Sequence, residues 1–134
     1  MMENTKTNNV EQVGGTHYNN PIQPWDIIAK YNLNWFQGEI LKYVTRFRFK
    51  GQKQDLMKAI SIAEKANLSG IHGIKKPDFK DIPFLLQYVQ MYTIYEPGDK
   101  LLYLYNIIVF TLSGEWTRVV EQINLLISEL WVEN

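Results

Sequence analysis

The chain has 134 residues, the size of one domain, and its 46% hydrophobic and 13% aromatic residues are enough to form a core. Its 14 basic residues balance 14 acidic ones, so the overall charge gives no reason to expect nonspecific binding to nucleic acid. The lack of cysteine excludes disulfides, thiolate zinc sites and cysteine nucleophiles. The lack of a signal peptide or a long apolar run leads us to expect no membrane insertion and a cytoplasmic location.

The chain begins with polar residues that follow no helical or strand pattern. We therefore predict a disordered tail over residues 1–13 and a single helical domain over residues 14–134. Two glycines then free the backbone to turn, and we expect an irregular arm up to the first helix. Proline is tolerated in the first turn of a helix, because the N–H group that it lacks would have no partner there. Pro24 therefore predicts a helix that runs to about Tyr31.

Two longer helices joined at Gly51 are predicted next. The first covers about residues 34–50, with Asn34 as its N-cap, and the second covers about residues 54–68. Apolar residues recur at helical spacing along both, at Phe36, Ile40, Val44, Phe47, Leu56, Ile60 and Ala63. Helices joined by so short a turn lie antiparallel, so we expect a helical hairpin.

The second half of the domain, residues 71–134, is predicted to form a loop followed by three helices. Glycine, proline and a Lys-Lys pair are typical of a loop over residues 71–81. The helices cover about residues 83–95, 100–112 and 115–131, although the β-branched and aromatic residues of 88–95 also suit a strand. The predicted fold is all-α, with two antiparallel helical hairpins and an irregular N-terminal arm.

Three cations, Lys42, Arg46 and Lys50, fall at positions i, i+4 and i+8 of the predicted helix 34–50, which places them along one side of it. Lys58 lies on the following helix, and Asp55 is the only acid between Lys42 and Lys58. Lysine can bind phosphate as a point charge and arginine as a bidentate fork, so this stripe predicts a phosphate site. A basic run is also typical of a solvated helix face, and that interpretation stays open.

Polar residues around the first helix form a second candidate group. His17, Tyr18 and Gln23 make a donor-rich segment suited to an anion or to the edge of a nucleotide, although a lone histidine is more often structural. Asp26 and Asp55 are candidate ligands for magnesium. Taken singly, each residue is more typical of a charge at a helix end or on the surface than of a metal ligand.

Several enzyme classes are excluded by motifs that the sequence lacks. It contains no G-x-x-x-x-G-K-[ST], so it is not a standard P-loop kinase. It also lacks the paired E-x-x-E helices of all-α pyrophosphohydrolases. With only His17 and His72, it cannot assemble the common histidine-metal hydrolase sites.

The segments GGTHYN, IQPWD, LNWFQGEILKYVTR, KG and DLMKA, which follow one another from Gly14 to about Leu68, resemble the SaV-like family of bacteriophage proteins. This family is long catalogued as a domain of unknown function. It includes a podophage kinase of deoxynucleoside monophosphates without a Walker motif, and members linked to bacterial abortive infection. The resemblance implies a nucleotide-related role, with ATP and Mg²⁺ as the cofactors of any phosphoryl transfer, but it assigns no catalytic residue.

Two functions from different classes follow. The first is binding of a nucleotide or another phosphorylated small molecule by His17, Tyr18, Gln23, Lys42, Arg46, Lys50 and Lys58, with phosphoryl transfer to a deoxynucleoside monophosphate as its chemistry. The second is a non-enzymatic phage effector, in the cytoplasm of the infected bacterium, that binds a host defence protein or sequesters a signalling nucleotide. We also expect a homo-oligomer, because aromatic residues are favoured at interfaces and the second half is rich in them, at Tyr88, Tyr92, Tyr95, Tyr103, Tyr105, Trp116 and Trp131.

Overall fold

The computed structural model describes residues 22–72, 77–92 and 99–131, and every regular element in these ranges is helical. In chain order the elements are α1 (Pro24–Tyr31), α2 (Trp35–Arg46), α3 (Gln52–Ser69), the 3-10 helix η3 (Phe79–Asp81), α4 (Ile82–Tyr92), α5 (Asp99–Ser113) and α6 (Trp116–Leu130). The all-α prediction is confirmed. Of the segment 88–95, which also suited a strand, residues 88–92 are helical and the rest lies outside the described residues.

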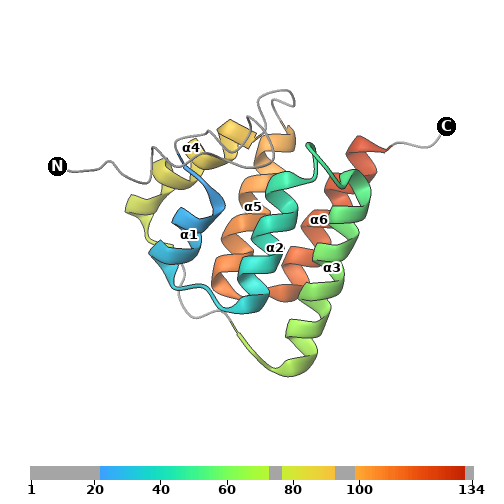
Figure 1. The fold of residues 1–134 in the computed structure, drawn as a ribbon, viewed down its shortest axis with the longest axis horizontal. Coiled ribbons are helices and arrows are strands. Elements are labelled where there is room, and N and C mark those ends of the chain that lie inside the picture. The colour runs from blue at the N-terminus through green and yellow to red at the C-terminus, as the bar shows by residue number, and fades with distance from the viewer. Residues whose placement is uncertain (1–21, 73–76, 93–98, 132–134) are drawn as a thin grey trace.

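Two antiparallel hairpins, α2 with α3 and α5 with α6, form the body of the molecule (Figure 1). They pack against each other mainly through α3 and α6, and also through α2 and α5. Helix α1 lies against α2, while α4 lies against α5. The two-hairpin prediction is confirmed, and the segment before the first hairpin adds a short helix to its outer side.

The start of α2 is fixed by Asn34, the N-cap residue that the sequence predicts, and the structure shows that this cap is reciprocal. The Asn34 side chain accepts the Gln37 N–H at 2.9 Å, and the Gln37 side chain accepts the Asn34 N–H at 2.9 Å. This pairing satisfies two N–H groups that a helix start leaves without partners. The end of α2 differs from the prediction, because the helix stops at Arg46 and four turn residues follow before Gly51.

The core lies between the two hairpins and extends to α1 and α4. Its fully buried side chains come from every helix that the structure describes except η3. They include Ile27, Ile40, Leu41, Val44, Leu56, Leu85, Tyr88, Ile107, Trp116, Val119 and Ile123. Of the apolar positions predicted for the first hairpin, Phe36 and Ile60 are only partly buried, since they lie at the edge of the core.

Buried polar groups connect the first hairpin to the second half of the chain. The Gln37 amide donates to the carbonyls of Thr111 and Leu112, at 3.1 and 2.9 Å. The hydroxyls of Thr45 and Tyr88 form a hydrogen bond inside the core. A buried polar group needs a hydrogen-bond partner to replace water, and each of these bonds supplies one. These contacts therefore fix how α2 docks against α5 and α4.

Most of the rings that led us to expect self-association are used inside the molecule. Tyr88, Tyr92 and Trp116 are buried, because they pack into the core and their polar atoms find partners there. The remaining described members of that set are partly buried against the core, and Tyr95 lies outside the described residues. Self-association stays a prediction, and the buried rings of Tyr88, Tyr92 and Trp116 offer no surface for it.

Among the residues that the structure describes, none of the helices combines the length and the apolar character needed to span a bilayer.

Candidate functional site

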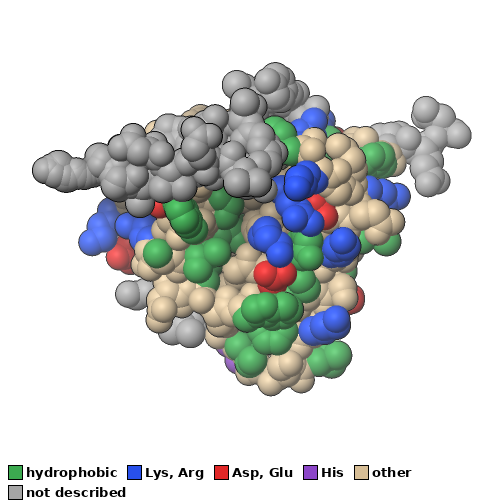
Figure 2. Space-filling model, in the orientation of Figure 1, with side chains coloured by type: hydrophobic (Ala, Val, Ile, Leu, Met, Phe, Trp, Pro, Cys, Tyr) green, Lys and Arg blue, Asp and Glu red, His purple; other side chains and the backbone are tan. Residues whose placement is uncertain are grey.

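Three cations surround the ring of Tyr43 on the face that α2 and α3 share. The Nζ of Lys42 and the Cζ of Arg46 each lie 4.9 Å from the ring centroid, and the Nζ of Lys58 lies 5.7 Å from it. The face of an aromatic ring attracts cations within about 6 Å, so it offsets part of their mutual repulsion. Figure 2 shows lysine and arginine side chains gathered on this face. We call Lys42, Tyr43, Arg46 and Lys58 the Tyr43 patch.

The charges of the patch are only partly balanced. Lys42 pairs with Glu39 one turn earlier, at 3.0 Å, and Arg46 pairs with Asp55. Lys58 is exposed and forms no ion pair with any residue that the structure describes. Among the described residues, three cations of the patch face two carboxylates, and Lys58, which has no carboxylate partner there, is the most open of the three to solvent.

Arg46 is held by a buried carboxylate. Its Nε and Nη2 donate to Asp55 Oδ2 and Oδ1 at 3.0 and 3.3 Å, and Oδ2 also accepts the Gly51 N–H at 3.1 Å. Asp55 is 1% exposed, so this is a charged pair largely withdrawn from water. The arginine fork predicted to bind phosphate is thus occupied by a carboxylate in this structure, and Arg46 contributes a positioned positive charge.

The structure differs from the predicted basic stripe at its last residue, Lys50. Because α2 ends at Arg46, Lys50 does not lie on a third turn of the same helix. The Arg46 carbonyl accepts the N–H groups of both Phe49 and Lys50, and the chain then turns at Gln52, whose φ is 54°. Lys50 is exposed in this turn. The stripe therefore continues from α2 onto α3 through Lys58, with the Tyr43 ring between the helices.

The residues predicted around the first helix have separate positions. Gln23 is the N-cap residue of α1, and the Asp26 carboxylate accepts its N–H at 2.8 Å. Asp55 lies on α3, and no three acidic or histidine side chains come together as a metal site in the described ranges. Magnesium binding by Asp26 or Asp55 stays a prediction. His17 and Tyr18 lie outside the described residues.

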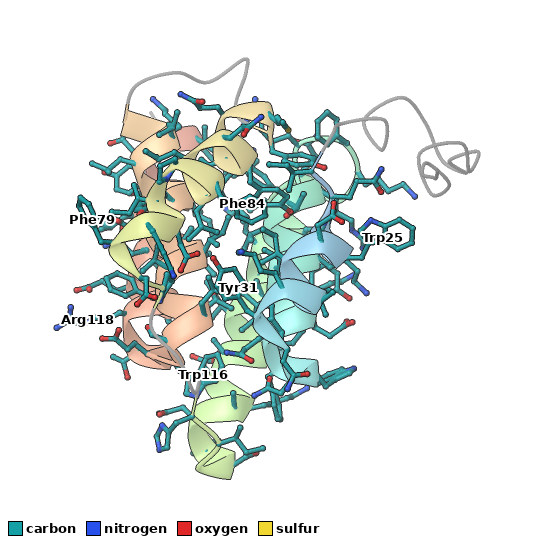
Figure 3. The ribbon with its side chains drawn as sticks, turned by 90° about the vertical axis from the view of Figure 1, so that its left-hand side faces the viewer. Trp25, Tyr31, Phe79, Phe84, Trp116 and Arg118 are labelled. Atoms are coloured by element: carbon teal, nitrogen blue, oxygen red, sulfur yellow. The ribbon has the colours of Figure 1, made fainter. Side chains whose placement is uncertain are left out.

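An apolar groove of about 520 Å³ lies between α1 and the first half of α2. It has an exposed tryptophan at the start of each helix, Trp25 at 52% and Trp35 at 62% exposure. Figure 3 shows Trp25 projecting from α1 away from the body of the molecule. The residues that line the groove are Gln23, Pro24, Trp25, Ile28, Leu33, Asn34, Trp35, Gly38, Glu39 and Lys42.

Lys42 connects the groove to the Tyr43 patch, because it lines one and contacts the ring of the other. Lys42 and Gln23 could be identified from the sequence, but the groove could not. Trp25 and Trp35 stand in the first turns of successive helices. A large apolar side chain in an amphipathic helix is expected to be buried, so neither residue indicated a groove. The available signal was the glycine at position 38 inside an amphipathic helix, where it weakens the helix.

Residues 12–64 match the sequence model of a family described as a protein of unknown function, DUF3310. This span contains α1, α2 and most of α3, and with them every residue that lines the groove and every member of the Tyr43 patch. The second hairpin lies outside it. No curated protein and no solved structure matches the chain.

Proposed function

We propose that the protein binds a nucleotide or another phosphorylated small molecule, with its phosphate at Lys42 and Lys58 of the Tyr43 patch. The observation that carries this proposal is the position of Lys42, which places a cation at the junction of an apolar groove and a positively charged face. A site that joins an apolar cleft to a few polar groups is the usual form of a small-molecule site. A volume of about 520 Å³ suits a ligand of nucleotide size.

The two lysines are suited to this role for different reasons. Lys58 forms no ion pair with a carboxylate in the described part of the chain, so a phosphate can approach it without displacing one of them. Lys42 must exchange Glu39 for the phosphate, but exposed pairs at i, i+3 contribute only about 0.2–0.5 kcal/mol. Arg46, fixed by Asp55, adds a positive potential without moving.

The finer proposal is a deoxynucleoside monophosphate kinase without a Walker motif, of the kind that the resemblance to SaV-like phage proteins implies. In that reaction an oxygen of the monophosphate would attack the γ-phosphorus of ATP, giving a diphosphate and ADP, and Mg²⁺ would supply neutralisation of the phosphate charge. Such transfer depends mainly on positioning and charge neutralisation, which lysines and a metal ion supply. Asp26 would hold the metal, because both oxygens of the buried Asp55 already accept hydrogen bonds from Arg46, and His17 and Gln23 would orient the nucleotide.

A thermal-shift series tests the binding proposal. Deoxynucleoside mono- and diphosphates and ATP would be added with and without Mg²⁺, since a ligand at a hundred times its Kd adds about 2.7 kcal/mol to stability. Lys58→Ala should weaken binding about tenfold or more, because a charge-assisted hydrogen bond is lost. Lys65→Ala, two turns further along α3 and exposed, is the matched control and should change affinity less than twofold.

The results separate the two functions. If no nucleotide shifts the melting temperature, or if Lys58→Ala and Lys65→Ala behave alike, the proposed site is wrong. If a nucleotide binds and ATP is consumed only when a monophosphate is present, the kinase is supported. Tight binding without turnover would favour the sequestering phage effector instead.

A further inference from the structure

The two tryptophans of the groove are exposed although both belong to helices that pack into the body of the molecule. The other described tryptophans, Trp116 and Trp131, are buried and partly buried. The Trp35 and Phe36 rings form a T-shaped pair, with centroids 5.3 Å apart and planes at 78°. Large apolar groups left in water beside a cleft are a mark of a binding surface. The exposed indole rings are suited to stacking with another planar ring.

Gly38, in the interior of α2, gives a second and independent observation. A Cβ at this position would lie 3.6 Å from the Ile28 Cδ1, an ordinary van der Waals contact. Packing between α1 and α2 therefore leaves room for alanine, which would strengthen the helix. Both Gly38 and Ile28 line the groove, so a methyl group at position 38 would narrow it. The glycine thus keeps the groove open at the expense of helix stability.

We infer that the groove between Trp25 and Trp35 holds the planar base of a nucleoside phosphate whose phosphate lies at Lys42 and Lys58. This inference rests on the proposed function and specifies the ligand: a phosphate that carries an aromatic ring, rather than a sugar phosphate or inorganic phosphate. Three features point to it, namely two exposed indole rings, a largely apolar lining and Lys42 as the cation of that lining. A base is uncharged and has a flat apolar face, which suits the apolar lining of the groove. The phosphate of the same molecule supplies a negative charge for Lys42.

The decisive comparison uses two ligands with the same phosphate. A deoxynucleoside monophosphate and ribose 5-phosphate would be titrated into the full-length protein, followed by tryptophan fluorescence and by calorimetry. Stacking of a base on an aromatic side chain typically strengthens binding about tenfold or more, so the nucleotide should bind at least tenfold tighter and quench the fluorescence. Trp25→Leu and Trp35→Leu should each reduce that ratio and leave the affinity for ribose 5-phosphate unchanged.

Gly38→Ala gives a test that does not alter an aromatic ring. It should raise the melting temperature or leave it unchanged, and at the same time weaken nucleotide binding several-fold. Ser61→Ala, at an exposed position of α3, should also favour its helix but leave nucleotide affinity within twofold. If Gly38→Ala binds nucleotide as tightly as the unaltered chain, the base does not lie in the groove.

The outcomes distinguish this inference from the function on which it rests. If both phosphates bind equally well and both depend on Lys58, the phosphate site stands and the groove inference is overturned, the groove then being covered by another part of the chain or by a protein partner. If neither phosphate binds, the proposed function itself is wrong and the inference with it. Selective, tryptophan-dependent binding of the nucleotide supports both.

Discussion

The carboxylate of Asp55 occupies the space where a side chain on residue 51 would stand. A Cβ built on Gly51 would lie 2.1 Å from both the Cγ and the Oδ1 of Asp55, far inside any real contact distance. Gly51 has φ −79°, which any residue can adopt, so the turn requires glycine there for space and not for backbone freedom. The left-handed residue of this turn is Gln52, with φ 54°. Gly51, Asp55 and Arg46 therefore act as one unit at the end of the hairpin.

This contact predicts strong coupling between positions 51 and 55. Gly51→Ala should lower the free energy of unfolding by about 2–3 kcal/mol, because the new methyl group displaces a carboxylate that Arg46 holds. Asp55→Ala should cost about 3 kcal/mol, since it leaves Arg46 without its partner. In the Asp55→Ala background the space is empty, and Gly51→Ala should then cost less than about 0.5 kcal/mol. Urea unfolding of the four proteins measures the coupling, and additive effects would contradict the arrangement.

Glu39 is predicted to restrain anion binding. Its carboxylate holds the Lys42 ammonium at 3.0 Å, and it lines the same groove. Glu39→Gln should therefore free Lys42 and strengthen binding of a nucleotide or of inorganic phosphate several-fold, while stability changes by less than about 0.5 kcal/mol. Calorimetric titration at two salt concentrations provides the measurement. Glu64→Gln, on an exposed part of α3, is the control. An affinity lowered by Glu39→Gln would show that Glu39 itself contacts the ligand.

Gln37 is predicted to be the polar residue of α2 whose substitution lowers stability most. It completes the cap at Asn34 and donates to two carbonyls at the end of α5. Gln37→Leu should cost about 2–4 kcal/mol, because buried carbonyls lose their donor. Gln37→Glu should cost more, since it places a carboxylate against those carbonyls. Asn34→Ala removes only the cap and should cost about 1 kcal/mol. Thermal unfolding of the three variants gives their order of stability. If Gln37→Leu is no less stable than Asn34→Ala, the hydrogen bonds from Gln37 to α5 do not contribute to stability.

Two tyrosines whose hydroxyls are buried predict a loss of stability at alkaline pH. Burial, and then the charge of Asp81, raises the pKa of Tyr31, and burial raises the pKa of Tyr88. The unfolded chain releases these protons near pH 10, whereas the folded chain retains them, so stability falls as pH rises above about 10. Tyr31→Phe should reduce that fall. Urea midpoints at pH 8 and pH 10.5 measure it.

The hydroxyls of the same two tyrosines should contribute differently to stability at neutral pH. The Tyr31 hydroxyl is buried on the inner side of α1, and no residue that the structure describes gives it a hydrogen bond of normal geometry (Figure 3). Tyr31→Phe should therefore leave stability unchanged or raise it. Tyr88→Phe should cost about 1 kcal/mol or more, because the buried Thr45 hydroxyl loses its partner. A clear loss in Tyr31→Phe would mean that Asp81 accepts the Tyr31 hydroxyl.

The fold class, the six α-helices of the described residues and most of their limits could be predicted from the sequence. Helical spacing of apolar residues, Pro24 in a first turn and Asn34 as a cap are local signals, and local signals act within about one helical turn. The start of α2 was predicted at the residue where it lies. Its end was predicted four residues late, because the turn that follows Arg46 is closed by the pairing of Arg46 with Asp55, nine residues further along the chain.

The candidate site was predicted only in part, for a related reason. Lys42 and Lys58 could be named from charge alone, but only the packing of α2 against α3 places both at the ring of Tyr43. Asp55 was considered as a metal ligand, and only the tertiary structure pairs both of its oxygens with Arg46. The groove between Trp25 and Trp35 depends on the angle at which α1 meets α2, which no residue pattern specifies. Helix formation is decided between neighbours in the chain, whereas charge pairing and cavity shape are decided between surfaces that meet only when the chain has folded.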